Sequence, residues 1–111
     1  MLHLSITRAV DAVFKAIADP TRRRILDHLA LRDDSVMELA KDFDISLPAV
    51  SQHLKVLRAA ELVQSERQGR QIVYRLNASP LHGVSQWIGS YERFWRTRLK
   101  ALGAHLRKKH G

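Results

Sequence analysis

Cysteine is absent from the 111 residues of the chain. This absence excludes disulfides, thiolate metal ligands and thiol redox switches. No apolar run approaches the roughly 18 residues that a membrane-spanning helix needs. The first residues also lack the long apolar stretch that follows a basic start in secretory signal peptides. We therefore expect a cytoplasmic protein with no membrane partner.

The sequence is also short of glycine, proline and negative charge, with 5 Gly, 3 Pro and 11 acidic residues against 19 Lys and Arg. No internal repeat, low-complexity segment or flexible linker interrupts it. We expect residues 1–111 to form a single domain with a modest core, as suits this length. The formal net charge of +8 predicts an acidic partner, although charge alone does not separate nucleic acid from a membrane surface.

The patterns that mark enzymes are missing. There is no Gly-rich phosphate loop, no nucleophile elbow, no Cys nucleophile and no pair of carboxylates beside a histidine. We therefore expect neither an enzyme nor a bound cofactor.

Residues 35–60 predict two short helices joined by a tight turn. Ser35 can cap the first helix, with Glu38 three residues later completing a capping box. The chain turns at Asp44. Ser46 can cap the second helix, where Pro48 is tolerated in the first turn because its missing N–H needs no intrahelical partner. This layout is typical of a helix-turn-helix DNA reader.

The second of these helices has two chemically different faces. Val50, Leu54 and Leu57 form an apolar stripe, and a spacing of about 100° per residue places small and polar residues opposite it or on its flanks. Gln52 can pair with an adenine edge, whereas Lys55 lies further along and suits a phosphate. The candidate DNA-binding residues of this helix are Ser46, Pro48, Ala49, Ser51, Gln52 and Lys55.

The remaining segments complete a recognisable order of elements. Helices are predicted from about Thr7 to Ala18 and from Pro20 onward, with Asp19 as the N-cap of the second. A hairpin follows at about 62–76, in which Arg67 and Arg70 flank Gly69 and are candidate contacts to the DNA backbone or minor groove. A last helix is predicted at about 79–107. The expected fold is mainly α with a small β-hairpin, a winged helix-turn-helix (α-α-α-α-β-β-α).

Three arginines, at 22–24, fall in the first turns of the second helix, where positive charge opposes the helix dipole by about 0.3 to 1 kcal/mol per residue. We expect the acidic residues Asp33, Asp34, Glu38, Asp42 and Asp44 to offset them, with phosphate as the other candidate.

The last predicted helix has an unusually long apolar stripe, with members at intervals of three and four residues. One chain of this size cannot cover so long a stripe, so a second copy is the economical partner, joined also by the first helix. We expect a dimer through the terminal helices, whose interface includes Val84, Trp87, Ile88, Tyr91, Phe94, Trp95, Leu99 and Leu102.

Three runs of sequence, at residues 14–26, 49–57 and 69–76, resemble the arsenic-repressor (ArsR) family of bacterial dimeric repressors. The resemblance implies a homodimer on an inverted-repeat operator in double-stranded DNA, with residues 46–58 in the major groove. It also implies a DNA contact for His53. That residue lies at the edge of the apolar stripe, where a packing role is equally open.

Many members of that family bind metals through cysteines in the first reader helix or through histidine and acidic residues on the last helix. Here the first set corresponds to residues 36–40, which include no thiol, and His82 and His105 are too far apart to share an ion within one chain. The resemblance therefore implies the metal-independent branch, with no metal site and an unknown effector. A metal-sensing repressor with an interchain His and carboxylate site, and a winged-helix module that binds protein, remain the alternatives.

Overall fold

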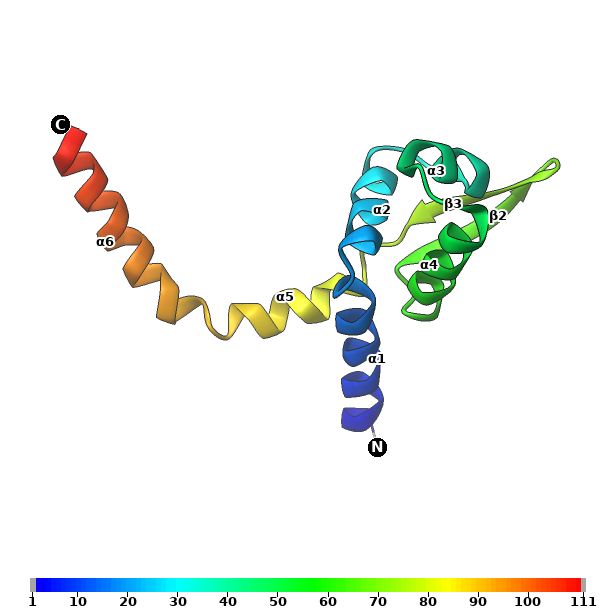
Figure 1. Ribbon diagram of the computed structural model, residues 1–111. Helices are drawn as coiled ribbons and strands as arrows, with labels where there is room; N and C mark the ends of the chain where they lie inside the picture. The colour runs from blue at the N-terminus through cyan, green and yellow to red at the C-terminus, as the bar shows by residue number, and fades with distance from the viewer. Residues whose placement is uncertain (1, 111) are drawn as a thin grey trace.

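The computed structural model describes the backbone of residues 2–110 and the side chains of residues 8–103. Four helices and a hairpin form the body, and two further helices lead away from it (Figure 1). Within the described part of the chain, none of the helices combines the length and the apolar character needed to cross a membrane. The elements are α1 (Leu2–Ile17), α2 (Pro20–Leu31), β1 (Asp34–Ser35), α3 (Val36–Phe43), α4 (Leu47–Ala59), β2 (Val63–Gln68), β3 (Gln71–Leu76), α5 (Leu81–Gly89) and α6 (Glu92–His110).

The strands form one antiparallel sheet in the order β1-β3-β2. β2 pairs with β3 along its whole length, from Val63 opposite Leu76 to Gln68 opposite Gln71. The hairpin turns at Gly69, whose φ of 63° suits a residue without a Cβ. The hairpin reaches beyond the helices as a wing (Figure 1). The two-residue strand β1 was not predicted, because two residues are too few to show an alternating pattern.

The core lies where α1, α2, α3 and α4 meet the sheet. Ile25 of α2, Leu39 of α3 and Leu62 before β2 are fully buried within it. The predicted stripe of α4 is buried as well, since Val50, Leu54 and Leu57 are at most 1% exposed. This packing holds α4 with its opposite face turned outward.

Two of the three arginines at the start of α2 bind the end of α1, not the acidic residues that we expected to offset them, and the third, Arg24, lies over the Phe43 ring at 5.5 Å from its centroid. Arg22 donates from Nε to the Ala16 carbonyl at 2.6 Å, and Arg23 donates from Nη1 to the Ile17 carbonyl at 2.7 Å. These carbonyls belong to the last turn of α1, where a helix carries partial negative charge and unpaired acceptors. The positive charge is therefore offset by one helix terminus, and the prediction of an acidic cluster was wrong.

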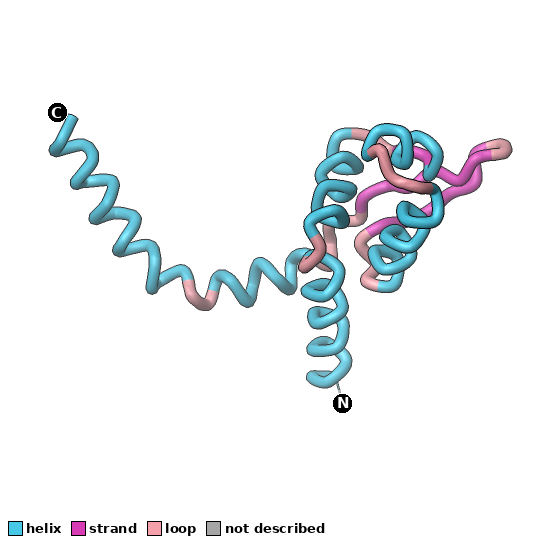
Figure 2. The backbone as a smooth tube through the Cα atoms, viewed as in Figure 1, coloured by secondary structure: helices cyan, strands magenta, loops and turns pink. Residues whose placement is uncertain are grey.

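The predicted C-terminal helix is two helices. It begins at Leu81 and is broken between Gly89 and Glu92, where Figure 2 shows a short loop. At the break the Ser90 hydroxyl donates to the Trp87 carbonyl at 2.6 Å, and the Tyr91 N–H donates to the Ile88 carbonyl. A side chain competing for a carbonyl and an i→i+3 bond are common where an α-helix ends.

α6 extends away from the body (Figure 1), and the radius of gyration is 18.4 Å. A compact domain of 100 residues has a radius of about 13 Å. The apolar side chains of this arm are open to solvent, with Trp95 47% and Leu102 55% exposed. The arm is therefore not covered by its own chain.

Candidate nucleic-acid interface

The end of β1 fixes the start of the reader unit. The Ser35 hydroxyl accepts from the Glu38 N–H at 3.2 Å, as predicted. The N–H of Ser35 donates to Oδ1 of Asp34 at 3.0 Å. In a capping box the Glu38 carboxylate would accept from the Ser35 N–H, but here Asp34 accepts that hydrogen bond. The predicted box is therefore only half formed.

The turn between α3 and α4 depends on Asp44, which has a left-handed φ of 52°. Asp is one of the few residues with a side chain that adopts this conformation readily. The Ile45 N–H then donates to the Ala40 carbonyl at 3.2 Å and closes the end of α3. Ser46 caps α4 by accepting from the Ala49 N–H at 3.2 Å, with Pro48 in the first turn. These contacts confirm the predicted helix-turn-helix.

The outward face of α4 carries most of the predicted DNA-binding residues. Within residues 8–103, no side-chain hydrogen bond or ion pair involves Gln52 or Lys55. An amide and an ammonium group without protein partners are free to bind a ligand placed against this face. Ser46, Pro48, Ser51, Gln52 and Lys55 are exposed, and Ala49 is half-buried beside them.

His53 differs from the other predicted residues because it faces α2. Its Nδ1 lies 3.9 Å from Oδ2 of Asp19, the N-cap of α2. That nitrogen is buried and has no hydrogen-bond partner among the described residues. The side chain is 21% exposed. This placement favours the packing role over a base contact.

Among the described residues, the carboxyl group of Asp19 is the one whose pKa is clearly shifted. The Arg22 backbone N–H donates to Oδ2 of Asp19 at 3.0 Å. This hydrogen bond, aided by the charges of Arg22 and His53, lowers the pKa of Asp19, although partial burial acts in the opposite direction. Asp19 is therefore stabilised as an anion at the positive end of α2.

The wing presents both predicted arginines to solvent. Arg67 folds back and donates from Nε to the Gly69 carbonyl at 3.3 Å, close to the tip. Arg70 is exposed on the other side of that glycine. The two guanidinium groups lie at the end of the hairpin, as the sequence predicted.

A cluster that the sequence did not reveal joins three elements behind the reader. Nε2 of His28 lies 2.8 Å from Oδ2 of Asp34 and 3.8 Å from Oδ2 of Asp42. These three side chains have the donor types of a metal site, and their ligand atoms lie within 4.8 Å of one another. However, Nη2 of Arg32 is 3.8 Å and 3.4 Å from the same two carboxylate oxygens. The carboxylates already have a cationic partner, and the network links α2, β1 and α3.

The predicted interface residues fall into two groups. Val84 is buried in the core of its own chain, so we remove it from the interface, and Trp87 packs edge-on against Phe14 of α1 with ring centroids 5.4 Å apart. Trp87 is nevertheless 53% exposed, and it belongs with the other predicted residues to one apolar series along α5 and α6 that is open in a single chain. The other members are Ile88, Tyr91, Phe94, Trp95, Leu99 and Leu102.

Comparison with known proteins agrees with this geometry. A family model described as "Bacterial regulatory protein, arsR family" matches residues 19–65. The transcriptional repressor SdpR of Bacillus subtilis is 45% identical over 76 residues, which cover 68% of this chain and 84% of SdpR. The chain belongs to the arsR family of bacterial regulatory proteins.

Two further relatives resemble this arsR-family chain over a larger part of its length. The regulator Rv2034 of Mycobacterium tuberculosis is 42% identical over 96 residues, 86% of this chain and 87% of its own. A possible ArsR-family regulator of Mycobacterium bovis, studied as a homodimeric winged helix-turn-helix DNA-binding domain, shares 25% identity at a TM-score of 0.68. That alignment covers 85% of this chain and 89% of the other. The winged helix-turn-helix prediction is confirmed.

The lowered pKa of Asp19 makes the stability of this arsR-family chain depend on pH. Because the folded pKa is depressed, the contribution is complete above the unfolded value of about 3.9 and is lost as pH falls through the folded pKa. We expect Asp19→Asn to unfold at lower urea than the wild type near pH 7, and this gap should close in acid. Asp27→Asn, at an exposed carboxylate of α2, is the control. A gap that stays constant down to about pH 2.5 would contradict this role.

Proposed function

We propose that this chain is a homodimeric transcriptional repressor that binds an inverted-repeat operator in double-stranded DNA. The observation that carries the proposal is the outward face of α4, opposite a fully buried stripe, where within residues 8–103 Gln52 and Lys55 have no side-chain hydrogen bond or ion pair. Relatives named as repressors, and a homodimeric DNA-binding neighbour, support it. The family is one of regulators, and no enzymatic activity is proposed.

In this proposal residues 46–58 lie in the major groove. Gln52 reads a base through its amide, and Ser51 binds a base edge or a phosphate. Ala49 and Pro48 allow close approach, whereas Ser46 and Lys55 lie nearer the backbone. His53 acts from behind, by packing against the N-terminus of α2.

The wing contacts the backbone or the adjacent minor groove through Arg67 and Arg70. Both guanidinium groups lie at the tip, where β2 and β3 have left the body of the protein (Figure 1). Contacts of this kind place a protein on DNA without reading its sequence.

A winged-helix module that binds protein is the weaker alternative. A helix that docks in a groove of a protein partner presents apolar anchors at i, i+3, i+4 and i+7. The outward face of α4 instead presents Gln52, Lys55 and Ser51. The net charge of +8 also suits a polyanion, so the observations favour DNA.

The dimer forms when a second copy covers the apolar side of the C-terminal arm, together with α1. The exposed residues Tyr91, Trp95 and Leu99 would then be buried at the interface. A two-fold axis places two copies of α4 on half-sites about one helical turn apart, roughly 34 Å. We also propose a cytoplasmic location and a metal-independent repressor, and leave the effector unassigned.

Base reading by Gln52 is tested on the operator and on random DNA. Gln52→Ala should cost about 1 to 3 kcal/mol on the operator and little on random DNA, because the amide pairs only with the correct base. Gel shifts with Gln86→Ala, which truncates an exposed amide on α5, provide the control. Equal losses on both DNAs would remove Gln52 from the base-reading residues.

The role of the arm is tested with Trp95→Ala. Truncation of a large buried side chain typically costs about 3 to 5 kcal/mol, so the variant should populate monomer at micromolar concentration and lose operator affinity. Thr97→Ala, on the other side of α6, should remain a dimer. Sedimentation and a gel shift on the same sample decide the question: a tight Trp95→Ala dimer with full affinity contradicts the proposed interface.

Metal independence is tested with zinc and with a chelator at constant ionic strength. Neither should change operator affinity, because the chain has no thiol and Arg32 already pairs with the carboxylates near His28. A zinc-dependent shift of about tenfold would contradict this. Its loss in Asp42→Asn would assign the ion to the His28 cluster, and its persistence would point to an interchain site.

A further inference from the structure

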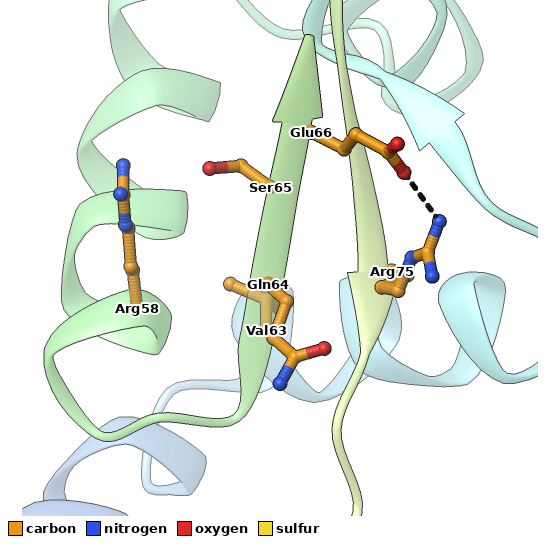
Figure 3. Close-up of a pocket in the computed structure, with 6 residues that line it drawn as sticks. All are labelled: Arg58, Val63, Gln64, Ser65, Glu66 and Arg75. Carbon is orange, nitrogen blue, oxygen red and sulfur yellow. Dashed lines mark hydrogen bonds and ion pairs between the residues drawn. The ribbon is translucent and has the colours of Figure 1, made fainter.

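A groove runs between the C-terminal half of α4 and the first strand of the wing (Figure 3). Its volume is about 490 Å³. One wall comes from α4 and the other from the hairpin. It is lined by Arg58, Val63, Gln64, Ser65, Glu66 and Arg75.

Side chains alternate along β2, and this alternation determines which of them point toward α4. Val63 and Ser65 share one side of the strand, and Gln64 and Glu66 share the other. Val63 is 2% exposed and belongs to the core. In Figure 3 the Ser65 hydroxyl points toward α4, where Arg58 lies along the helix. A hydroxyl and a guanidinium group therefore face each other across the groove.

The charges of the lining residues are not balanced. Oε2 of Glu66 lies 2.8 Å from Nη2 of Arg75, and Nε of Arg75 lies 3.8 Å from Asp33 on its other side. The Glu66 carboxylate points away from α4 (Figure 3) and is neutralised there. Within residues 8–103, Arg58 has no side-chain hydrogen bond or ion pair. Arg58 is therefore the charged residue of this lining that has no partner of opposite charge among the described residues.

Arg58 lies on the flank of α4 that faces the wing. It follows Ser51 by seven residues, about 10 Å along the helix and on nearly the same side. A duplex that takes α4 into its major groove passes its two backbones along the two sides of the helix. On the wing side, such a backbone would run over this groove before it reaches the arginines of the tip.

We propose that the groove seats the DNA backbone, with a phosphate held by the Arg58 guanidinium and the Ser65 hydroxyl. This inference rests on the proposed function and adds two residues to the interface. A guanidinium fork matches the oxygens of a phosphate, and a hydroxyl supplies a further donor. The contact does not distinguish one base from another. It fixes the position of α4 and of the wing on the same duplex.

The test is the salt dependence of binding to a random duplex of about 30 base pairs. Each phosphate neutralised contributes about 0.9 to the slope of log affinity against log salt. Arg58→Gln should reduce the slope by about 0.9 for each bound subunit, whereas Ser65→Ala should weaken binding about threefold to tenfold at an unchanged slope, because a neutral hydroxyl is lost. Arg98→Gln, which removes an exposed arginine of α6, should leave the slope as it is.

Arg58→Lys guards against a variant that fails to fold, because it keeps the charge and the aliphatic stem. It should retain the slope but bind more weakly than the wild type, since an ammonium group lacks the guanidinium fork. An Arg58→Gln protein that melts like the wild type and keeps the full slope overturns the proposed phosphate contact of Arg58 and Ser65. If the wild type itself fails to prefer an operator over random DNA, the proposed repressor function fails. The salt slope on random DNA still tests the phosphate contact of Arg58 in that case.

Discussion

The burial of Val50, Leu54 and Leu57 fixes the rotation of α4 about its own axis, and the interface depends on that rotation. A shift of one residue in this packing would turn the helix by about 100°. Such a turn would carry Gln52 from the open face to a flank of the helix and bring Ser51 or His53 into its place. The same rotation places Arg58 beside the wing and His53 beside α2. The packing of this apolar stripe thus determines which elements lie beside each flank of α4.

Much of the reader could be predicted because its signals are local. Ser35 and Ser46 cap helices within three residues of themselves, and Pro48 is compatible only with the first turn. The buried stripe follows from helical spacing, and Gly69 marks the turn of the wing because it has no Cβ. Each of these features depends on a few neighbouring residues, so the sequence alone was sufficient to locate the outward face of α4.

Other features depend on contacts between distant segments, and the sequence did not reveal them. Arg22 finds its acceptors on the preceding helix, so its charge could not be assigned from its position in α2 alone. β1 exists only because β3 pairs with it. Glu61 takes a left-handed φ of 61° after α4, where a glycine would have been the expected signal. The Arg58 groove was missed for the same reason, since its second wall belongs to the hairpin.

The break at Ser90 falls within one apolar series. Before it, Val84 is buried in its own chain and Trp87 packs on Phe14 but stays 53% exposed; after it, Trp95 and Leu102 lie on an arm that the chain does not cover. A straight helix over this span would hold both parts along one line, whereas the break lets the arm leave the body in a new direction. In the proposed dimer the separation of the two copies of α4 is then set by the packing of the arms, so operator spacing depends on residues that touch no DNA.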